Sequence, residues 1–185
     1  MNAPTHFFIF DVESVGLHGE GFAVAGGMYS SSGQKLKEFA YHCRPSEADG
    51  LPDDREWVAE NVTFHPSSVE QMNPFMVRDR FWNEWMYAKS AFKAMMFVEC
   101  GWPVEAAFME ACIKDHQETR NWDGPYPMHE IASVMLAAGM DPMATYGREE
   151  SEKPAHEPLA DARQSARLLF TALDRLSGET PSPQQ

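Results

Sequence analysis

The most constraining feature of the 185-residue sequence is the stretch HFFIFDVESVGLHG at residues 6–19. Four apolar residues, Phe7 to Phe10, are typical of a buried strand, and they lead directly into Asp11 and Glu13. Residues two apart in a strand point to the same face, so both carboxylates face the same way. Two negative charges beside a hydrophobic core are unfavourable unless something positive lies between them. The stretch therefore predicts an opening strand that ends at a cation.

The length and the apolar content of 43% are sufficient for one hydrophobic core. We therefore predict a single domain over residues 1–176 and a disordered tail over residues 177–185. The sequence has no apolar run near 18 residues, and no basic region precedes its first hydrophobic stretch. These features predict neither a membrane span nor a signal peptide, and no membrane partner.

Cysteine usage indicates the compartment. The three cysteines Cys43, Cys100 and Cys112 are odd in number and form no C-x-x-C pair. We therefore expect neither a disulfide framework nor a zinc ribbon. We expect reduced thiols in a cytoplasmic protein.

The formal net charge of −13 limits the kind of partner. A protein that binds long nucleic acid by neutralising many phosphates is usually basic on at least one face. Either the partner of this chain is not a polyanion, or the chain contacts few phosphates and uses bound cations to do so. Plain acidic proteins are also common, so the charge alone does not decide.

The hydrophobic periodicity predicts one mixed β-sheet with helices packed on it, an α/β fold. Strands are predicted at residues 6–13, 21–29, 35–43 and 94–101, with a Ser/Gly hairpin turn at 30–34. Helices are predicted at residues 54–64, 73–90, 102–117, 127–138 and 158–176, with loops at 44–54 and 141–157.

Two of these helices carry an acid in the first turn. Glu105 lies beside the apolar stripe of its helix, directly after a strand, whereas Glu110 lies on the opposite side, four residues before Lys114. Asp161 opens the last helix, with His156 in the loop before it. The helix dipole explains a first-turn acid equally well, and a lone loop histidine is often an ordinary surface residue.

The placement of these residues suggests a common site. The ends of the first strand and of the two helices can converge in a mixed sheet. Four carboxylates together would repel one another, so they imply divalent cations, and oxygen-only ligands suit Mg²⁺ or Mn²⁺. We therefore predict a pair of metal ions at Asp11, Glu13, Glu105 and Asp161.

With these positions, the sequence resembles the DEDDh 3′–5′ exonucleases of the ribonuclease-H-like superfamily. The first motif of that family, D-x-E-[T/S]-x-G-L, is matched by DVESVGL at residues 11–17. Its last motif, H-x-x-L-x-D-A, is matched by HEPLADA at residues 156–162. The motifs stand in the order of the family, and the resemblance covers nearly the whole chain. It implies a ribonuclease-H-like mixed β-sheet flanked by α-helices.

The middle motif departs from the family. Members typically show a His-Asn pair and then Phe-Asp at the start of this helix. Here GWPVEAAFM aligns Glu105 with the expected aspartate and puts Trp102 and Pro103 in place of His-Asn. Asp115 and Glu99 are weaker candidates for the same role.

The resemblance implies an activity and a role for each residue. Asp11, Glu13, Glu105 and Asp161 would hold two Mg²⁺ or Mn²⁺ ions, one activating water and the other stabilising the leaving 3′-oxygen. His156 would be the general base. The implied substrate is the 3′ end of single-stranded RNA or DNA, and the product is a nucleoside 5′-monophosphate. Free-standing members of this size are often homodimers, so the resemblance also allows a homodimer.

Other readings of the sequence remain open. The segment RFWNEWMYAK at residues 80–89 could line a nucleic-acid groove, or its Phe81, Trp85 and Ala88 could form a packing stripe. His18 and Gly19 could approach the terminal nucleotide. The alternative to the enzyme is a catalytically weakened nucleic-acid-binding or interaction module with the same fold.

Overall fold

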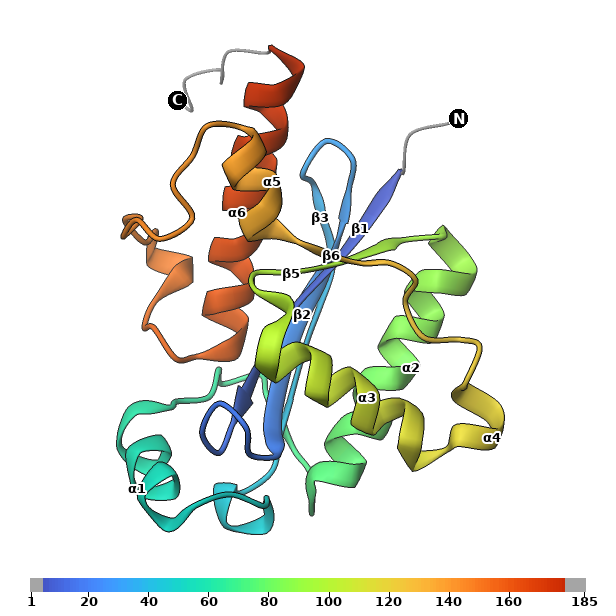
Figure 1. The fold of residues 1–185 in the computed structure, drawn as a ribbon, viewed down its shortest axis with the longest axis vertical. Helices are drawn as coiled ribbons and strands as arrows, with labels where there is room; N and C mark the ends of the chain where they lie inside the picture. The colour runs from blue at the N-terminus through green and yellow to red at the C-terminus, as the bar shows by residue number, and fades with distance from the viewer. Residues whose placement is uncertain (1–4, 179–185) are drawn as a thin grey trace.

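The computed structural model of this protein describes residues 5–178, and its centre is a six-stranded sheet (Figure 1). The predicted opening strand is β1 (His6–Ser14), which pairs antiparallel with β2 (Gly21–Ser30). Strand β2 pairs antiparallel with β3 (Lys35–His42) through the predicted hairpin turn. In that turn Gly33 has φ of +79°, a conformation that glycine adopts without a steric penalty.

Parallel pairs complete the sheet on both sides. Strand β5 (Met95–Val98) pairs parallel with β1, and β6 (Met128–Glu130) pairs parallel with β5. Strand β4 (Val69–Glu70) pairs parallel with β3 at the opposite edge. The strand order is β4-β3-β2-β1-β5-β6. This mixed sheet flanked by helices confirms the predicted α/β class of the ribonuclease-H-like type.

Helices and helical turns connect the strands. The helices are α1 (Pro52–Asn61), α2 (Pro74–Phe92), α3 (Ala106–Asp115), α4 (Gln117–Arg120), α5 (Ile131–Ala137) and α6 (Pro158–Ser177). Shorter helical turns are η1 (Pro45–Glu47), η2 (Gly101–Glu105) and η3 (Glu150–Glu152). Among the residues from 5 to 178, no helix has the length and apolarity needed to cross a membrane.

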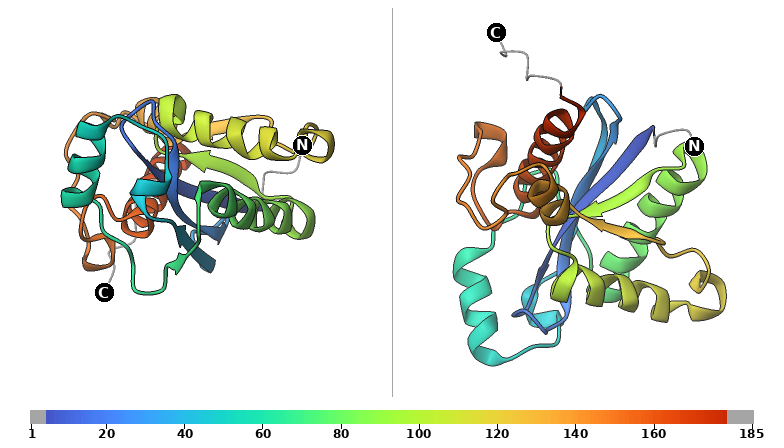
Figure 2. Two further views of the ribbon diagram at one scale, coloured as in Figure 1. Left: turned by 90° about the horizontal axis from the view of Figure 1, so that it is seen from below. Right: turned by 45° about the horizontal axis from the view of Figure 1, so that its top comes forward.

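The two faces of the sheet carry separate hydrophobic cores. Helices α2 and α3 cover one face, and α5 and α6 cover the other (Figures 1 and 2). The alternation along β1 follows this division: Phe8 and Phe10 pack on the α2 side with Phe81, whereas Phe7 and Ile9 pack on the α6 side. Asp11 and Glu13 continue the second series, so β1 directs both carboxylates to the face that α6 covers.

Several predicted boundaries were wrong, each for a local reason. Helix α1 begins at Pro52 rather than at residue 54, because proline suits the first helical turn. The helix predicted at 102–117 is divided into η2, α3 and α4, since Trp102 is extended (φ −128°, ψ 138°) and His116 also lies outside helical geometry.

Two strands were missed. Strands β4 and β6 have two and three residues, too few to show an alternating pattern, and both depend on pairing with a neighbour in the sheet. The helix predicted at residues 127–138 includes the segment of β6, whereas α5 begins only at Ile131.

The last helix extends one residue beyond its predicted end. Ser177 belongs to α6, and Gly178 ends the helix with φ of +76°. The predicted tail therefore begins later than residue 177, and its residues 179–185 lie outside the described residues.

Candidate active site

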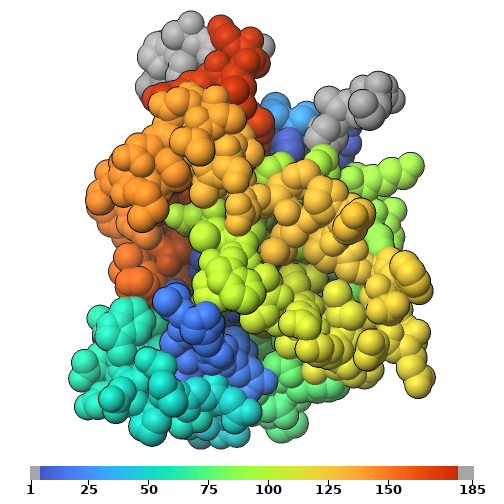
Figure 3. Space-filling view, viewed as in Figure 1, coloured from blue at the N-terminus to red at the C-terminus, as the bar shows by residue number. Residues whose placement is uncertain are grey.

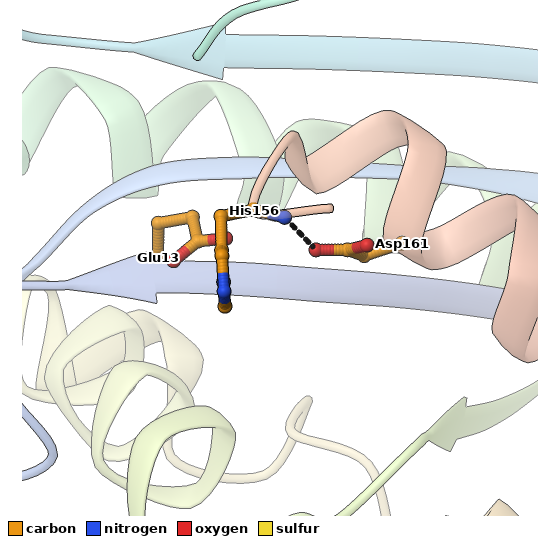
Figure 4. Close-up of side chains that lie close together, drawn as sticks. All are labelled: Glu13, His156 and Asp161. Carbon is orange, nitrogen blue, oxygen red and sulfur yellow. Dashed lines mark hydrogen bonds between the residues drawn. The ribbon is translucent and has the colours of Figure 1, made fainter. Parts of the chain in front are cut away.

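Strand β1 and helix α6 bring the first and last motifs together. Glu13 lies at the end of β1, and Asp161 lies in the first turn of α6. The ligand atoms of Glu13, His156 and Asp161 all lie within 4.8 Å of one another. Figure 4 shows the three side chains converging, with the histidine beside both carboxylates. The two halves of the predicted site, 143 residues apart between Glu13 and His156, therefore meet in space.

His156 is held by its backbone. Its N–H donates a hydrogen bond of 2.9 Å to Oδ2 of Asp161 (Figure 4), and its carbonyl accepts one of 3.0 Å from the N–H of Thr63. Its φ of +58° is unusual for a residue with a side chain. The imidazole is exposed and lies edge-on to Trp57, with 5.2 Å between ring centroids. The backbone of His156 is thus fixed, while its imidazole remains accessible to a reactant.

Glu105 reaches the site from the end of η2. It is only 8% exposed, and the backbone N–H groups of Glu105 itself and of Val12 in β1 favour its ionised form and lower its pKa. Burial is the main reason that the pKa of Glu105 rises to about 7, and the charge of Glu99 adds to the rise. The glutamate at the middle motif therefore lies against the strand that carries the other two acids.

Asp11 and Glu105 are not among the three residues whose ligand atoms converge within 4.8 Å, but their charges and those of Glu13 and Asp161 influence one another. Burial raises the pKa of Asp11 well above its ordinary value, and Asp161, Glu13 and Glu105 raise it further. Burial also raises the pKa of Glu13 to about 8, again with contributions from Asp161 and Glu105. None of the described lysines or arginines forms an ion pair with Asp11, Glu13 or Glu105. Most of this negative charge therefore lacks a counter-charge within the described part of the chain.

One basic side chain at the site was missed by sequence reasoning. Arg148 donates a hydrogen bond of 2.5 Å to Oδ1 of Asp161 and a second, of 2.8 Å, to the carbonyl of Glu152. Burial raises the pKa of Asp161, while the Arg148 guanidinium opposes the rise. Arg148 lies in the irregular segment before α6, where no periodicity relates it to Asp161, so the sequence held no signal for this contact.

The weaker candidates for the middle position separate in the structure. Asp115 lies outside the cluster, because it forms an ion pair with the buried Arg78, at 2.6 Å. Glu99 lies near enough to raise the pKa of Asp11 and of Glu105, and it accepts a hydrogen bond of 2.7 Å from the hydroxyl of Ser165. Glu99 is therefore a fifth carboxylate at the border of the site.

A pocket of about 370 Å³ opens beside these residues. It is lined by Glu13, by the segment after β1 that includes Gly16 and Leu17, by Val104 and by His156. The space-filling view shows the turn after β1, α1 and the η2–α3 segment meeting on one face (Figure 3). This volume lies within the range of small-ligand sites, about 300–1,000 Å³.

The aromatic residues of α2 belong to the core. Phe81, Trp82, Trp85 and Ala88 are buried against the sheet, which supports the packing-stripe reading of residues 80–89. Lys89 pairs with Asp123 at 2.8 Å. His18 lies near Trp102, at 6.4 Å between ring centroids, and Trp102 is 70% exposed.

The carboxylates fit a divalent cation. Their oxygens are the ligands that Mg²⁺ and Mn²⁺ prefer, and their raised pKa values result from burial and mutual repulsion, which a bound cation would relieve. The imidazole of His156 lies next to the cluster and can approach a reactant there.

Neither protein-family models nor curated proteins match this sequence. The assignment of a function therefore depends on the geometry of the site and on the resemblance of its motifs.

Proposed function

We propose that the protein is a metal-dependent 3′–5′ exonuclease of the DEDDh type, which removes nucleoside 5′-monophosphates from the 3′ end of single-stranded RNA or DNA. The observation that carries the proposal is the convergence of Glu13, His156 and Asp161, with their ligand atoms within 4.8 Å of one another. These residues come from both motifs of the family, and the charges of Asp161, Glu13 and Glu105 all raise the pKa of Asp11.

The four acids would hold two Mg²⁺ or Mn²⁺ ions, which when bound supply an activated water and stabilise charge on the leaving oxygen. Asp11 and Glu13 hold their positions because β1 fixes them, and Asp161 because α6 does. Glu105 is buried where η2 meets α3. Rigid support of this kind keeps the carboxylates close together in spite of their repulsion.

His156 would accept the proton of the attacking water. Histidine suits proton transfer near neutral pH, and the exposed imidazole of His156 lies beside the carboxylates. The hydrogen bond from its backbone N–H to Asp161 couples the position of the base to that of an acid in the cluster.

The pocket would hold the terminal nucleotide. Its apolar wall includes Leu17, Trp57 and Val104, and its polar wall includes Glu13 and His156. A site for a few terminal nucleotides needs no long basic surface, so the net charge of −13 is compatible with this substrate. Trp57, which is 48% exposed, offers a stacking surface for a base.

The proposal extends to the setting of the protein. The three cysteines are free thiols, and Cys43 and Cys112 are buried, which fits a reducing cytoplasm. A homodimer stays a prediction, and sedimentation equilibrium would measure it directly.

The test is the degradation of 5′-labelled single-stranded RNA and DNA oligomers with Mn²⁺ or Mg²⁺. We expect a ladder that shortens from the 3′ end, disappears with EDTA and is lost in His156→Ala. His116→Ala is the matched control, because His116 is an exposed histidine directly after α3, outside the cluster. A metal-dependent rise in melting temperature without cleavage of either substrate would instead support the alternative, a binding module with the same fold.

A further inference from the structure

Asp54 is a carboxylate of the pocket that the proposed chemistry does not use. It lies in the first turn of α1 and lines the pocket together with Glu13 and Trp57. Its neighbour Asp53 is exposed, as an ordinary first-turn acid would be, whereas Asp54 is partly buried. The two adjacent aspartates therefore differ in environment although they share the same helix end.

The carboxylate of Asp54 lies against the glycine of the first motif. A Cβ built on Gly16 would come within 2.2 Å of Oδ2 of Asp54, and Gly16 has φ of +76°. The absence of a side chain at residue 16 therefore makes room for this carboxylate. The first motif and α1 fit together at this contact, on the wall of the pocket.

No described side chain neutralises Asp54 through an ion pair or a hydrogen bond. The adjacent Arg55 donates instead to the carbonyl of Ala48, at 2.8 Å. An ionised carboxylate is an acceptor without a donor of its own. Asp54 thus gives the pocket an acceptor group on α1 that is separate from the proposed metal ligands.

An acceptor that is not used by the proposed metal ions limits the kind of ligand group that fits beside it. A phosphate would be repelled by the Asp54 carboxylate, whereas a neutral O–H or N–H donor would form a charge-assisted hydrogen bond. In a 3′-terminal nucleotide, such donors are the sugar hydroxyls and the amino or imino groups of the base. Trp57 lies one helical turn after Asp54, so a base stacked on its indole would have its edge or its sugar near the carboxylate.

We propose that Asp54 is a specificity residue, which accepts a hydrogen bond from a sugar hydroxyl or a base N–H group of the nucleoside bound in the pocket. This inference rests on the proposed function for the identity of the ligand. It explains why an acid lies unpaired in a pocket that is otherwise apolar on the side of α1.

The test measures binding rather than cleavage. The dissociation constants of AMP and of three analogues are determined by calorimetry in the presence of Mn²⁺. The analogues are the 2′-deoxy, the 3′-deoxy and the purine riboside monophosphates, each of which lacks one donor of AMP. The proteins are the wild type, Asp54→Ala, Asp54→Asn and the matched control Asp53→Ala, which removes the same charge from the same helical turn.

We expect Asp54→Ala to weaken AMP binding about tenfold, because a hydrogen bond to a charged group is lost. Asp54→Asn keeps one acceptor oxygen, so we expect a smaller loss, and Asp53→Ala should bind as the wild type does. For the wild type, one analogue should bind about tenfold more weakly than AMP does. For Asp54→Ala, the same analogue and AMP should bind with equal affinity. That analogue identifies the donor as the 2′-hydroxyl, the 3′-hydroxyl or the base amino group.

Several results would overturn the inference. The first two are AMP binding to the wild type that is too weak to measure and an AMP affinity of Asp54→Ala within twofold of the wild type. The others are an equal loss of AMP affinity in Asp53→Ala, and losses from Asp54→Ala and from each of the three analogues that simply add in free energy. Should Asp54→Ala fail to fold, Asp54→Asn with the same panel decides. Cleavage by the wild type with unchanged affinity in Asp54→Ala would reject the role of Asp54 alone. AMP binding that depends on Asp54 without cleavage would reject the exonuclease alone.

Discussion

At the scale of single residues, Glu105 has two roles that pull in different directions. Burial and the charge of Glu99 favour the neutral form of its carboxylate, whereas the backbone N–H groups of Glu105 and Val12 favour the ionised form. The balance leaves the pKa at about 7. Besides its proposed role as a ligand, Glu105 is therefore a buried acid whose protonation changes near neutral pH.

The raised pKa predicts a pH-dependent effect of Glu105→Gln in the absence of metal. Between pH 4.5 and about 7 the folded state retains a proton that the unfolded chain has released, so this group makes the free energy of unfolding fall as pH rises. Glutamine does not titrate, so Glu105→Gln removes this decrease in stability at high pH. We expect the variant to be as stable as, or less stable than, the wild type at pH 4.5 but more stable by at least about 1 kcal/mol at pH 8, since one pKa unit corresponds to about 1.4 kcal/mol.

Urea unfolding with EDTA at the two pH values measures this difference. The control is Glu110→Gln, because Glu110 is an exposed acid of the same segment that pairs with Lys114 at 2.7 Å. A stability difference between Glu105→Gln and the wild type that stays constant from pH 4.5 to pH 8 would contradict the prediction.

Gly16 is the second residue whose type the structure explains. We expect Gly16→Ala to lower the free energy of unfolding by about 1–3 kcal/mol, because its φ of +76° strains any other residue. The new Cβ would also collide with Asp54, at 2.2 Å. Gly147→Ala is the control, since a Cβ there meets no atom within 4 Å, and its effect should stay within about 0.5 kcal/mol.

A double variant separates the two causes. Gly16→Ala combined with Asp54→Ala should recover the part of the loss due to the collision but not the part due to φ. Urea unfolding of the four proteins provides the coupling energy, and strictly additive losses would show that Asp54 and residue 16 do not touch.

At the scale of elements, the segment 147–156 is tied to α6 by several independent contacts. Arg148 and the N–H of His156 occupy the two carboxylate oxygens of Asp161. Arg167 of α6 donates to Glu152 and to the carbonyl of Gly147. A cation that binds Asp161 through Oδ1 must therefore displace Arg148, and the proposed base His156 lies in the same segment.

This competition predicts that Arg148→Met raises the affinity for Mn²⁺. The substitution frees Oδ1 of Asp161 and removes a positive charge from the site, so we expect a dissociation constant about three- to tenfold lower, as measured by calorimetry. The metal-free protein should be less stable, because Asp161 loses a partner. Arg167→Met is the matched control, since it loosens the same segment without freeing Asp161. Equal affinities in both variants would show that Arg148 does not compete with the metal.

The elements also show what sequence patterns can predict. The two motif-bearing elements, β1 and α6, have strong local signals: an apolar run for one, and a proline start with a 3.6-residue apolar period for the other. These signals bring Glu13 and Asp161 to the ends of elements that meet, and their ligand atoms lie within 4.8 Å of one another. Glu105 was placed because it follows strand β5 at the start of a helical segment.

Features that depend on distant partners were not predictable in this way. Strand β6 exists because β5 offers an edge to pair with, and its three residues carry no pattern of their own. The contact of Arg148 with Asp161 and that of Asp54 with Gly16 depend on how irregular segments return to the sheet. Such contacts depend on tertiary structure, which local periodicity does not encode.

At the scale of the whole molecule, negative charge is concentrated where β1, near the N-terminus, meets α6, near the C-terminus. The protein has a net charge of −13, and the cluster adds a cost that α6 packed on β1 must overcome. The cores on the two faces of the sheet provide the stability that holds these acids together. A cation that binds only the folded state would convert this repulsion into stabilisation.

This linkage predicts that Mn²⁺ or Mg²⁺ raises the melting temperature. At a free concentration of 100 times the dissociation constant, one bound ion adds about 2.7 kcal/mol to the free energy of unfolding. Burial and acidic neighbours raise the pKa of the Asp11 carboxyl group, which means that its ionised form is unfavourable in the folded protein. Asp11→Asn removes this unfavourable charge, so the metal-free variant should melt at a higher temperature than the metal-free wild type. The rise in its melting temperature on adding metal should be smaller than that of the wild type.

The control for net charge is Asp53→Asn, because Asp53 is exposed on α1. It should leave both the metal-free melting temperature and the rise on adding metal unchanged. Thermal scans at pH 8 with EDTA and then with excess Mn²⁺ measure both effects, and equal metal shifts in the wild type and in Asp11→Asn would count against the proposed metal site.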